Sequence, residues 1–282
     1  MNIFKLGTVM KIRELENIAK ILVFCAATLS PLSFASSGSD AEDNKRGLEI
    51  ANNASEIDDY YQDLVFDMTM IIRNSTGMAL ERELLAKTFE VDGDGNKTLL
   101  IFRSPKDQKG TILLTHTHKY EHDDQMIYLP ALKRVKRIAS TNKSGPFVGS
   151  EFAYEDITPQ EVEKYTYKYI RDEQYEDVNC HVVERTPLAE SSGYSRQVVW
   201  YDEHELYIRK IDYYDRKNKL YKTLKYVGYR QYSDRYWRAD SATMTNHRND
   251  KSTELIAKNW KFKNGLDESQ FSRNALQRTR IR

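Results

Sequence analysis

Regular alternation of apolar and polar side chains is the feature that most constrains the fold of this chain. Between residues 63 and 72, one face of an extended backbone would carry five apolar side chains: Leu64, Phe66, Met68, Met70 and Ile72. Polar side chains such as Asp67 and Thr69 would lie on the other face. A period of two residues belongs to a β-strand and does not fit a helix. The segment therefore predicts a strand with one buried face.

Further strand-like runs follow at short intervals along the chain. They are Arg82–Val91, Lys97–Arg103, Gly110–His118, Gln125–Leu129, Arg134–Ala139, Tyr165–Arg171, Asn179–Arg185, Arg196–Asp202, Leu206–Asp212, Leu220–Tyr229, Trp237–His247 and Thr253–Phe262. Short links rich in Asp, Gly, Asn and Lys join several of them, as is typical of hairpins. Strands do not alternate with long helices, so the pattern predicts a meandering antiparallel sheet rather than a parallel one.

Three helical segments are expected beside this sheet. Residues 42–54 have a modestly amphipathic pattern. Thr158 and Pro159, followed by Glu161, have the order of a helix start and predict a short helix that ends near Lys164. Asp267 begins a weaker pattern of the same kind near the end of the chain.

The first 35 residues have the order of a secretory signal peptide. Basic residues precede the apolar run 21–29, and Ser33-Phe34-Ala35 supplies the small residues that a signal peptidase reads. A membrane anchor is the weaker interpretation, because the run is shorter than the roughly 20 residues that a span needs. We predict cleavage after Ala35, which leaves residues 36–282 as a single periplasmic domain. Met1 and Met10 both remain open as the start of translation.

Composition excludes several classes of function. Lys and Arg number 43 and Asp and Glu 42, so no global charge favours nucleic acid. Beyond residue 35 no segment is long and apolar enough to span a bilayer. Cys180 lies alone in a strand-like run, which indicates a buried, inert thiol. Motifs of hydrolases, nucleotide-binding enzymes and zinc proteases are absent, and we expect no enzymatic activity.

Two patterns resemble metal sites. His116 and His118 share one face of a strand, with His122, Asp123 and Asp124 nearby. A strand that ends in a solvated loop produces the same pattern without a metal, and we expect neither a metal nor a cofactor. The segment from Asp92 to Asn96 resembles the start of a calcium loop, but Arg103 stands where a bidentate Glu is needed. It is better interpreted as a hairpin turn.

A dense basic cluster consists of Lys133, Arg134, Lys136 and Arg137. Two interpretations remain open for it. The cluster is either a solvated hairpin or a contact for anionic lipid headgroups or for the acidic surface of a partner.

The segment that contains this cluster resembles a known family. The ordered motifs are Tyr128-Leu129-Pro130, the basic run 133–137, Gly149-Ser150 and Tyr154-Glu155-Asp156. Together they resemble the stretch that marks a family of exported bacterial outer-membrane lipoprotein-sorting proteins, which are similar in fold to LolA and LolB. The rest of the chain fits this family more loosely.

The resemblance implies an all-β dominated (α+β) fold. A curved antiparallel sheet would form an open, unclosed barrel, with helices covering its concave face and an apolar trough beneath them. Such a protein would carry a lipid or the acyl chains of a lipoprotein toward the outer membrane. Its N-terminal and 158–164 helices would serve as a lid. The expected trough residues are Leu64, Phe66, Met68, Met70, Ile72, Leu100, Phe102 and Leu113.

Two other functions remain open. Family members are often associated with inner-membrane exporters of the RND type, so the resemblance implies such a partner. The chain would then be either a carrier or a non-catalytic interaction subunit without bound lipid. An enzyme that uses His116 and His118 is the third alternative.

Overall fold

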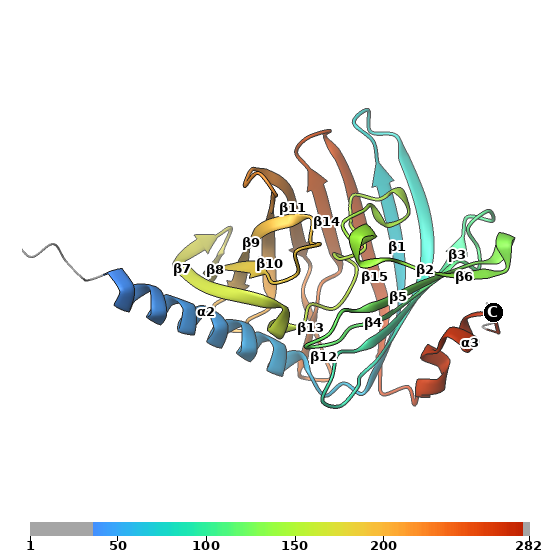
Figure 1. Cartoon of the computed structure of the whole chain (residues 1–282), viewed down its shortest axis with the longest axis horizontal. Helices are drawn as coiled ribbons and strands as arrows, with labels where there is room; N and C mark the ends of the chain where they lie inside the picture. Colours follow the sequence, from blue (N-terminus) through green and yellow to red (C-terminus); the bar gives the residue numbers. More distant parts are fainter. Residues whose placement is uncertain (1–35, 279–282) are drawn as a thin grey trace, which may run out of the picture. The chain divides into compact units, whose positions relative to one another are not determined.

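The computed structural model describes residues 36–278, and one antiparallel sheet of 13 strands dominates them (Figure 1). The chain divides into two compact units, Met1–Ser39 and Asp40–Arg282, and every described strand belongs to the second. The predicted signal peptide lies outside the described residues.

The first half of the sheet contains β1 (Asp63–Arg73), β2 (Ala79–Phe89), β3 (Lys97–Ser104), β4 (Ile112–His116), β5 (Asp124–Leu129) and β6 (Arg134–Arg137). The second half contains β7 (Tyr165–Tyr175), β8 (Val178–Pro187), β9 (Tyr194–Asp202), β10 (Ile208–Asp215), β11 (Leu220–Val227), β14 (Ser241–Asn246) and β15 (Lys251–Phe262). A separate ribbon pairs β12 (Arg230–Tyr232) with β13 (Tyr236–Arg238). The main helical elements are α2 (Ser36–Asp58), η4 (Val162–Lys164), η5 (Glu268–Phe271) and α3 (Arg273–Leu276).

The order of strands explains why the sheet stays open. It reads β6-β5-β4-β3-β2-β1-β15-β14-β11-β10-β9-β8-β7, so two meanders join where β1 pairs with β15. The outer edges are β6 and β7, which are consecutive in the chain but do not pair. The predicted curved, unclosed antiparallel sheet is therefore confirmed.

The predicted strands agree with the observed ones, with one split. The run 237–247 is divided between β13 and β14. The helix expected at 42–54 is confirmed as part of α2, and Asp267 caps η5 by accepting a hydrogen bond from the backbone N–H of Ser269 at 2.8 Å.

The helix predicted to begin at Thr158 is wrong, because only the single turn η4 forms. The Thr158 hydroxyl donates to the Glu155 carbonyl at 3.0 Å instead of capping a helix. The Gln160 side-chain amide donates to the carbonyls of Glu155 and Thr158 at 2.9 and 2.8 Å. Side chains thus satisfy the backbone groups that a helix would have used, and the segment stays extended.

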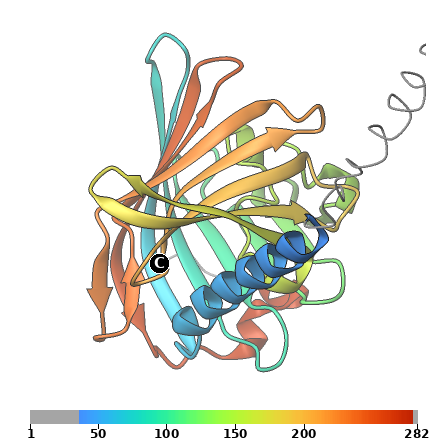
Figure 2. The same cartoon turned by 90° about the vertical axis from the view of Figure 1, so that its left-hand side faces the viewer.

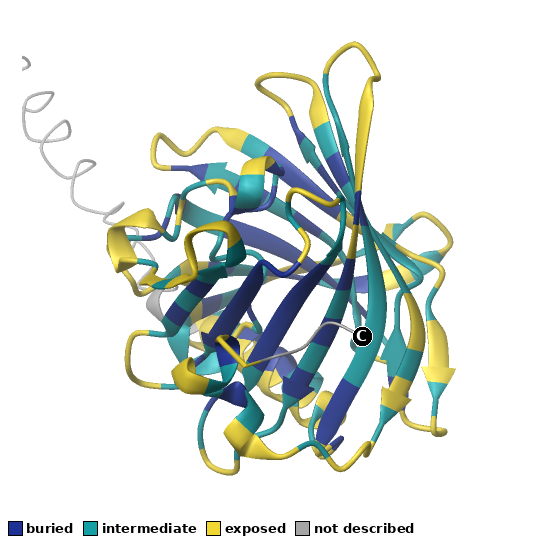
Figure 3. Ribbon diagram, turned by 90° about the vertical axis from the view of Figure 1, so that its right-hand side faces the viewer, coloured by how far each residue is buried: buried dark blue, intermediate teal, exposed yellow. Residues whose placement is uncertain are grey.

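The two faces of the sheet bury different clusters. Along β3, Leu100 and Phe102 belong to the core on the concave face. Leu99 and Ile101 point to the opposite face, where Phe271 and Leu276 of the C-terminal helical turns cover them. Figure 3 shows buried residues along the strands and exposed residues at the hairpin tips. The C-terminal helical turns therefore stabilise the convex face, away from the concave core.

The bridging segment (residues 138–164) connects the unpaired edges β6 and β7 and packs on the concave face. Its Phe147 joins the core of the first half and its Phe152 that of the second. Buried polar groups hold it there: Arg82 donates to the Val148 carbonyl at 2.6 Å, and Lys222 donates to the Glu151 carbonyl at 2.6 Å. The segment thus takes the place of the strand pairing that would have closed the barrel.

Helix α2 lies against the concave core at the β7 end of the sheet (Figure 2). Ile50 and Ala51 are its buried contacts. Gly47 permits the close approach, since a Cβ built there would lie 2.7 Å from the backbone N of Tyr169 in β7. Only glycine leaves room for the backbone of β7 at this point of the helix.

We expect Gly47→Ala to destabilise the protein, even though alanine is intrinsically better than glycine in a helix by about 1 kcal/mol. The added Cβ meets β7 backbone, which cannot move without breaking the β7–β8 pairing. Urea unfolding of Gly47→Ala and of Asn53→Ala, at an exposed position of α2, checks this. An equal gain in stability in both variants would contradict the close contact.

Candidate ligand-binding cavity

A cavity of about 500 Å³ lies between α2, the concave face and the strap (residues 158–162 of the bridging segment). Helix α2 contributes Ala51, Ala54 and Ile57, and β1 contributes Leu64 and Phe66. Strands β7 to β11 supply much of the remaining sheet wall, together with Thr88 of β2 and Trp260 of β15. Both meanders of the sheet therefore contribute to one cavity, whose roof consists of elements outside the sheet.

Nine aromatic side chains line the wall. They are Tyr61, Phe66, Tyr167, Tyr201, Tyr207, Tyr226, Tyr229, Trp237 and Trp260. Phe66 stacks on Trp260 with ring centroids 3.9 Å apart, and Tyr207 stacks on Tyr229 at the same distance. Stacked rings lose little conformational entropy on binding, so the wall is pre-organised for apolar contact.

Arg185 is the unusual member of this wall. It occupies a position of β8 on the same face as the core residue Val183, and it is only 4% exposed. Its Nε donates to Gln197 at 2.8 Å, and its guanidinium lies 4.7 Å from the centre of the Tyr165 ring. Among the described residues it forms no ion pair.

The tyrosines around Arg185 do not neutralise its charge. Burial raises the pKa of Tyr165 to about 12 and also raises the pKa of Tyr201, whose hydroxyl hydrogen-bonds Arg185. Both phenols therefore stay neutral near pH 7. A buried cation without a directly paired counter-ion is costly, because its desolvation is only partly repaid, here by the more distant charge of Asp156. The cavity wall thus offers one positive site for an anionic group.

Acidic groups gather where α2 ends beside the cavity. Asp58 forms an ion pair with Arg238, and Asp59 lies next to it. Glu90 is fixed nearby, since its two carboxylate oxygens accept the backbone N–H groups of Tyr60 and Gln62 at 2.6 Å each. Burial, followed by the charges of Glu90 and Asp58, raises the pKa of Asp59 to about 6.

A second cavity of about 420 Å³ lies on the other side of the strap, and charged side chains are frequent in its lining. Its lining includes Asp123, which pairs with Lys143 at 3.5 Å and with Lys164. Thr158 to Glu161 line both cavities. The strap therefore separates an aromatic cavity from a charged one.

The structure separates the predicted trough residues into two groups. Leu64 and Phe66 line the aromatic cavity. The other predicted residues pack in or against the core beneath Phe147 of the bridging segment, outside the lining of either cavity: Met68, Met70, Ile72, Leu100, Phe102 and Leu113. The bridging segment fills the part of the concave face that these side chains would otherwise have offered to a ligand.

The basic cluster lies away from both linings. Lys133, Arg134, Lys136 and Arg137 are all exposed on or beside the edge strand β6. Arg137 pairs with Asp124 on the neighbouring strand at 2.5 Å. Charged side chains on an edge strand also hinder pairing with other sheets, which is a sufficient structural role for them.

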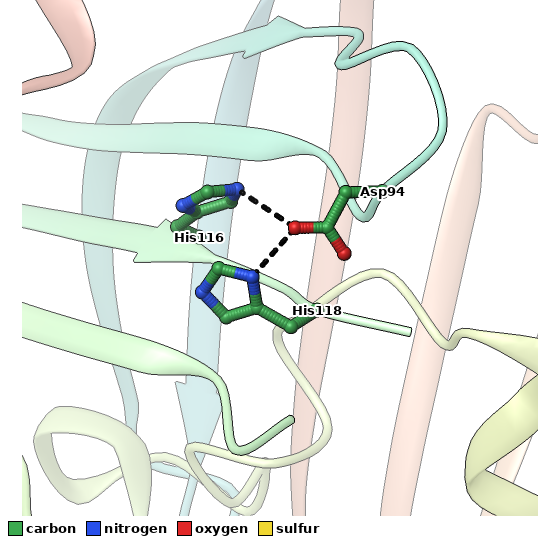
Figure 4. Close-up of side chains that lie close together, drawn as sticks. All are labelled: Asp94, His116 and His118. Carbon is green, nitrogen blue, oxygen red and sulfur yellow. Dashed lines mark hydrogen bonds and ion pairs between the residues drawn. The ribbon is translucent and has the colours of Figure 1, made fainter. Parts of the chain in front are cut away.

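His116 and His118 come together with Asp94 of the β2–β3 turn, outside the lining of the aromatic cavity (Figure 4). The turn itself is the predicted hairpin link. Cys180 is fully buried, as predicted, and burial raises the pKa of its thiol to about 11.

Comparison with known proteins identifies the family. A domain from Vibrio parahaemolyticus, provisionally named an outer membrane lipoprotein-sorting protein domain, is 46% identical; the match covers 83% of this chain and 99% of that one, with a TM-score of 0.81. The chain belongs to this lipoprotein-sorting family.

Other comparisons agree with the LolA-like fold. A DUF1329 family protein from Desulfovibrio piger is 29% identical over 83% of this chain and 99% of that one, with a TM-score of 0.78. A LolA superfamily protein from Nitrosomonas europaea is 16% identical over 81% of this chain and 98% of that one, with a TM-score of 0.66, and shares the fold. A family model described as "-like: Uncharacterized protein" matches residues 94–278. No curated protein matches the chain.

Arg185 was not among the residues predicted for the LolA-like cavity, whereas the strap was expected there as a helical lid. Arg185 had a detectable signal, because it stands at an apolar-face position of a strand, two residues after Val183. The extended conformation of the strap had no such signal, since its residues imitate a helix start. Within the part of the chain that the structure describes, no helix is long and apolar enough to cross a membrane.

We expect Asp59→Asn to stabilise the LolA-like domain at pH 7 and to have little effect near pH 4. The pKa of Asp59 is raised from 3.8 to about 6 in the folded protein. The free energy of unfolding therefore decreases as pH rises from about 4 to about 6, and above that range the ionised carboxylate destabilises the fold in full. Removing the charge should gain on the order of 1 kcal/mol after solvent screening. Urea unfolding at pH 4, 6 and 8 measures this, with Asp177→Asn in the exposed β7–β8 turn as the control. A gain that does not change with pH would contradict the assignment.

Proposed function

We propose that this LolA-like protein is a non-catalytic periplasmic carrier that binds the acyl chains of a lipid or lipoprotein in the aromatic cavity. One observation carries the proposal: an aromatic and aliphatic cavity of about 500 Å³ is roofed by α2 and the strap rather than by sheet. Its volume falls within the roughly 300–1,000 Å³ that is usual for ligand sites.

The energetics suit transport through water. Each buried methylene gains about 0.8 kcal/mol, so ten methylenes gain about 8 kcal/mol. A carrier must also release its cargo, which requires a roof that opens without unfolding the sheet. Helix α2 and the strap meet this need because neither is hydrogen-bonded into the strand ladders.

The first experiment is native mass spectrometry of protein purified from periplasm without detergent, followed by solvent extraction. We expect a non-covalent adduct that extracts as lipid. Ala54→Trp should lose it, because the indole would project from α2 into the cavity. Asn53→Trp places the same side chain at the neighbouring, exposed position and should retain the adduct.

Two outcomes would contradict the carrier proposal. Wild-type protein that shows only its own mass, and that takes up no lipid from vesicles of phosphatidylethanolamine and phosphatidylglycerol, would favour the interaction-subunit alternative. The exposed basic edge of β6 would then be the docking surface to test against an inner-membrane exporter. An equal lipid load in wild type and Ala54→Trp would place the cargo elsewhere.

We also propose that Arg185 selects cargo with an anionic group near the apolar chain. An anion beside it would supply the direct ion pair that Arg185 does not make with the described side chains, and a charge-assisted hydrogen bond to such a group is worth about 1.5–3 kcal/mol. The cavity would then bind amphiphiles in one orientation, with the charge at β8.

Arg185→Met tests this selection. Wild type should bind a fluorescent fatty acid about tenfold more tightly than its methyl ester, and the variant should bind both equally. Methionine fills similar volume, and replacing a buried charge by an apolar group often preserves stability. Arg196→Met is the control, since Arg196 stacks on Tyr214 at 3.5 Å on the opposite face. An unchanged preference in Arg185→Met would assign Arg185 to structure alone.

A further inference from the structure

Three potential metal ligands meet at one rim of the sheet (Figure 4). Asp94 comes from the β2–β3 turn, His116 ends β4 and His118 follows two residues later. The two histidines point to the same side of the chain. Thr117 points to the other side, where its hydroxyl donates to Glu161 of the strap at 2.6 Å. The cluster is thus outside the aromatic cavity and uses residues that the carrier proposal does not.

The ligand atoms have separations close to those of a tetrahedral site. Asp94 Oδ2 lies 2.7 Å from His118 Nδ1 and 3.7 Å from His116 Nε2. Zinc bonds of about 2.0–2.1 Å at tetrahedral angles place neighbouring ligand atoms about 3.3 Å apart. One observed value lies about 0.6 Å below this distance and the other about 0.4 Å above it, and the three ligand atoms all lie within 4.8 Å of one another.

His116 supplies the independent sign of a missing ligand. Its Nε2 is buried and has no hydrogen-bond partner. The neighbours of His116 across the sheet are Lys97 and Asp124, and both are engaged elsewhere, with Glu268 and Arg137. A buried polar atom without a partner costs free energy, and native structures rarely leave one without a reason.

The backbone around the cluster is already fixed in place. Asp94 Oδ1 accepts the Lys119 N–H at 3.0 Å, which leaves Oδ2 directed at the histidines. The Thr117 N–H donates to the Asn96 carbonyl at 3.0 Å, so the turn is bound to the segment that carries both imidazoles. Such supporting hydrogen bonds orient ligands before a metal arrives.

We propose that Asp94, His116 and His118 bind a divalent transition-metal ion, with zinc as the representative species. Two imidazole nitrogens and one carboxylate oxygen suit Zn²⁺ and its neighbours, and they suit Mg²⁺ or Ca²⁺ poorly. Three protein ligands leave a fourth position for solvent, which the partial exposure of all three side chains permits. The ion would fix the β2–β3 turn to the end of β4.

The alternative is a hydrogen-bonded turn in which His118 and Asp94 need no metal. His116→Ala separates the two interpretations, because it leaves the 2.7 Å contact between His118 and Asp94 intact. His116→Gln keeps more of the side-chain volume if the alanine variant folds poorly. His122→Ala is the matched control, since His122 is exposed and nearby but outside the cluster.

The experiment uses the mature chain without a polyhistidine tag, stripped with chelator and titrated with Zn²⁺ by calorimetry. We expect one equivalent in wild type and in His122→Ala. His116→Ala, His116→Gln and Asp94→Asn should bind about 100-fold more weakly or not at all. Titration of the wild type with Co²⁺ should give the intense visible absorption of a tetrahedral ion, a readout that depends on no variant. Absence of a stoichiometric Zn²⁺ site in wild type, or equal affinity in wild type and both His116 variants, would overturn the proposal.

Discussion

The unpaired edges of the sheet are the constraint on which the rest of this structure depends. Strands β6 and β7 follow one another in the chain but end at opposite sides of the sheet, and the bridging segment must connect them. It does so across the concave face, where its backbone would be buried without water. The anchor is a buried polar group: Asp156 accepts hydrogen bonds from the Ala153 N–H at 2.7 Å and the Tyr194 hydroxyl at 2.8 Å, with Lys222 at 3.9 Å.

This constraint also determines where a cavity can exist. Phe147, Phe152 and Tyr154 of the bridging segment fill the middle of the concave face. The aromatic cavity lies where the segment leaves that core as the extended strap and α2 takes over the cover. The family motif at Tyr154-Glu155-Asp156 is therefore explained by the anchoring of the bridge rather than by direct contact with cargo, since none of these residues lines the aromatic cavity.

Sequence periodicity predicted the strands well because each side chain of a strand reports directly on burial. The apolar face of β1 runs without a break from Leu64 to Ile72. It does so although the pairing of β1 with β15 shifts register between Val65 and Asp67. Periodicity could not say which apolar face stays open, because that depends on the bridging segment. Hence Met70 and Phe102, predicted for a trough, lie beneath Phe147 instead.

The missed residues have a common physical cause. The sequence suggested a helix at Thr158, because a capping pattern depends only on neighbouring residues. The strap is instead held by Glu161, which accepts a hydrogen bond from Thr117, a residue far away in the sequence. Asp94 likewise joins His116 and His118 only through the register of β3 and β4. Spacing along the chain placed His116 and His118 on one face, where no metal was expected, and tertiary structure adds Asp94 beside them.

The strengths of the contacts indicate which part of the roof moves. The bridge from Phe147 to Asp156 is held by Arg82, Lys222 and Tyr194 inside the core, and breaking a buried charge pair typically costs about 3–5 kcal/mol. Helix α2 is held at β7 by Arg46 with Asp172 and by Asp40 with Lys168, all of them about half exposed. Exposed pairs of this kind contribute about 0–1 kcal/mol each. The ion pairs of α2 with β7 are therefore weaker than the buried polar contacts of the bridge, although Ile50 and Ala51 also hold the helix in the core. Under the proposed carrier function, α2 would be the part of the roof that opens, while the bridge keeps the two halves of the sheet together.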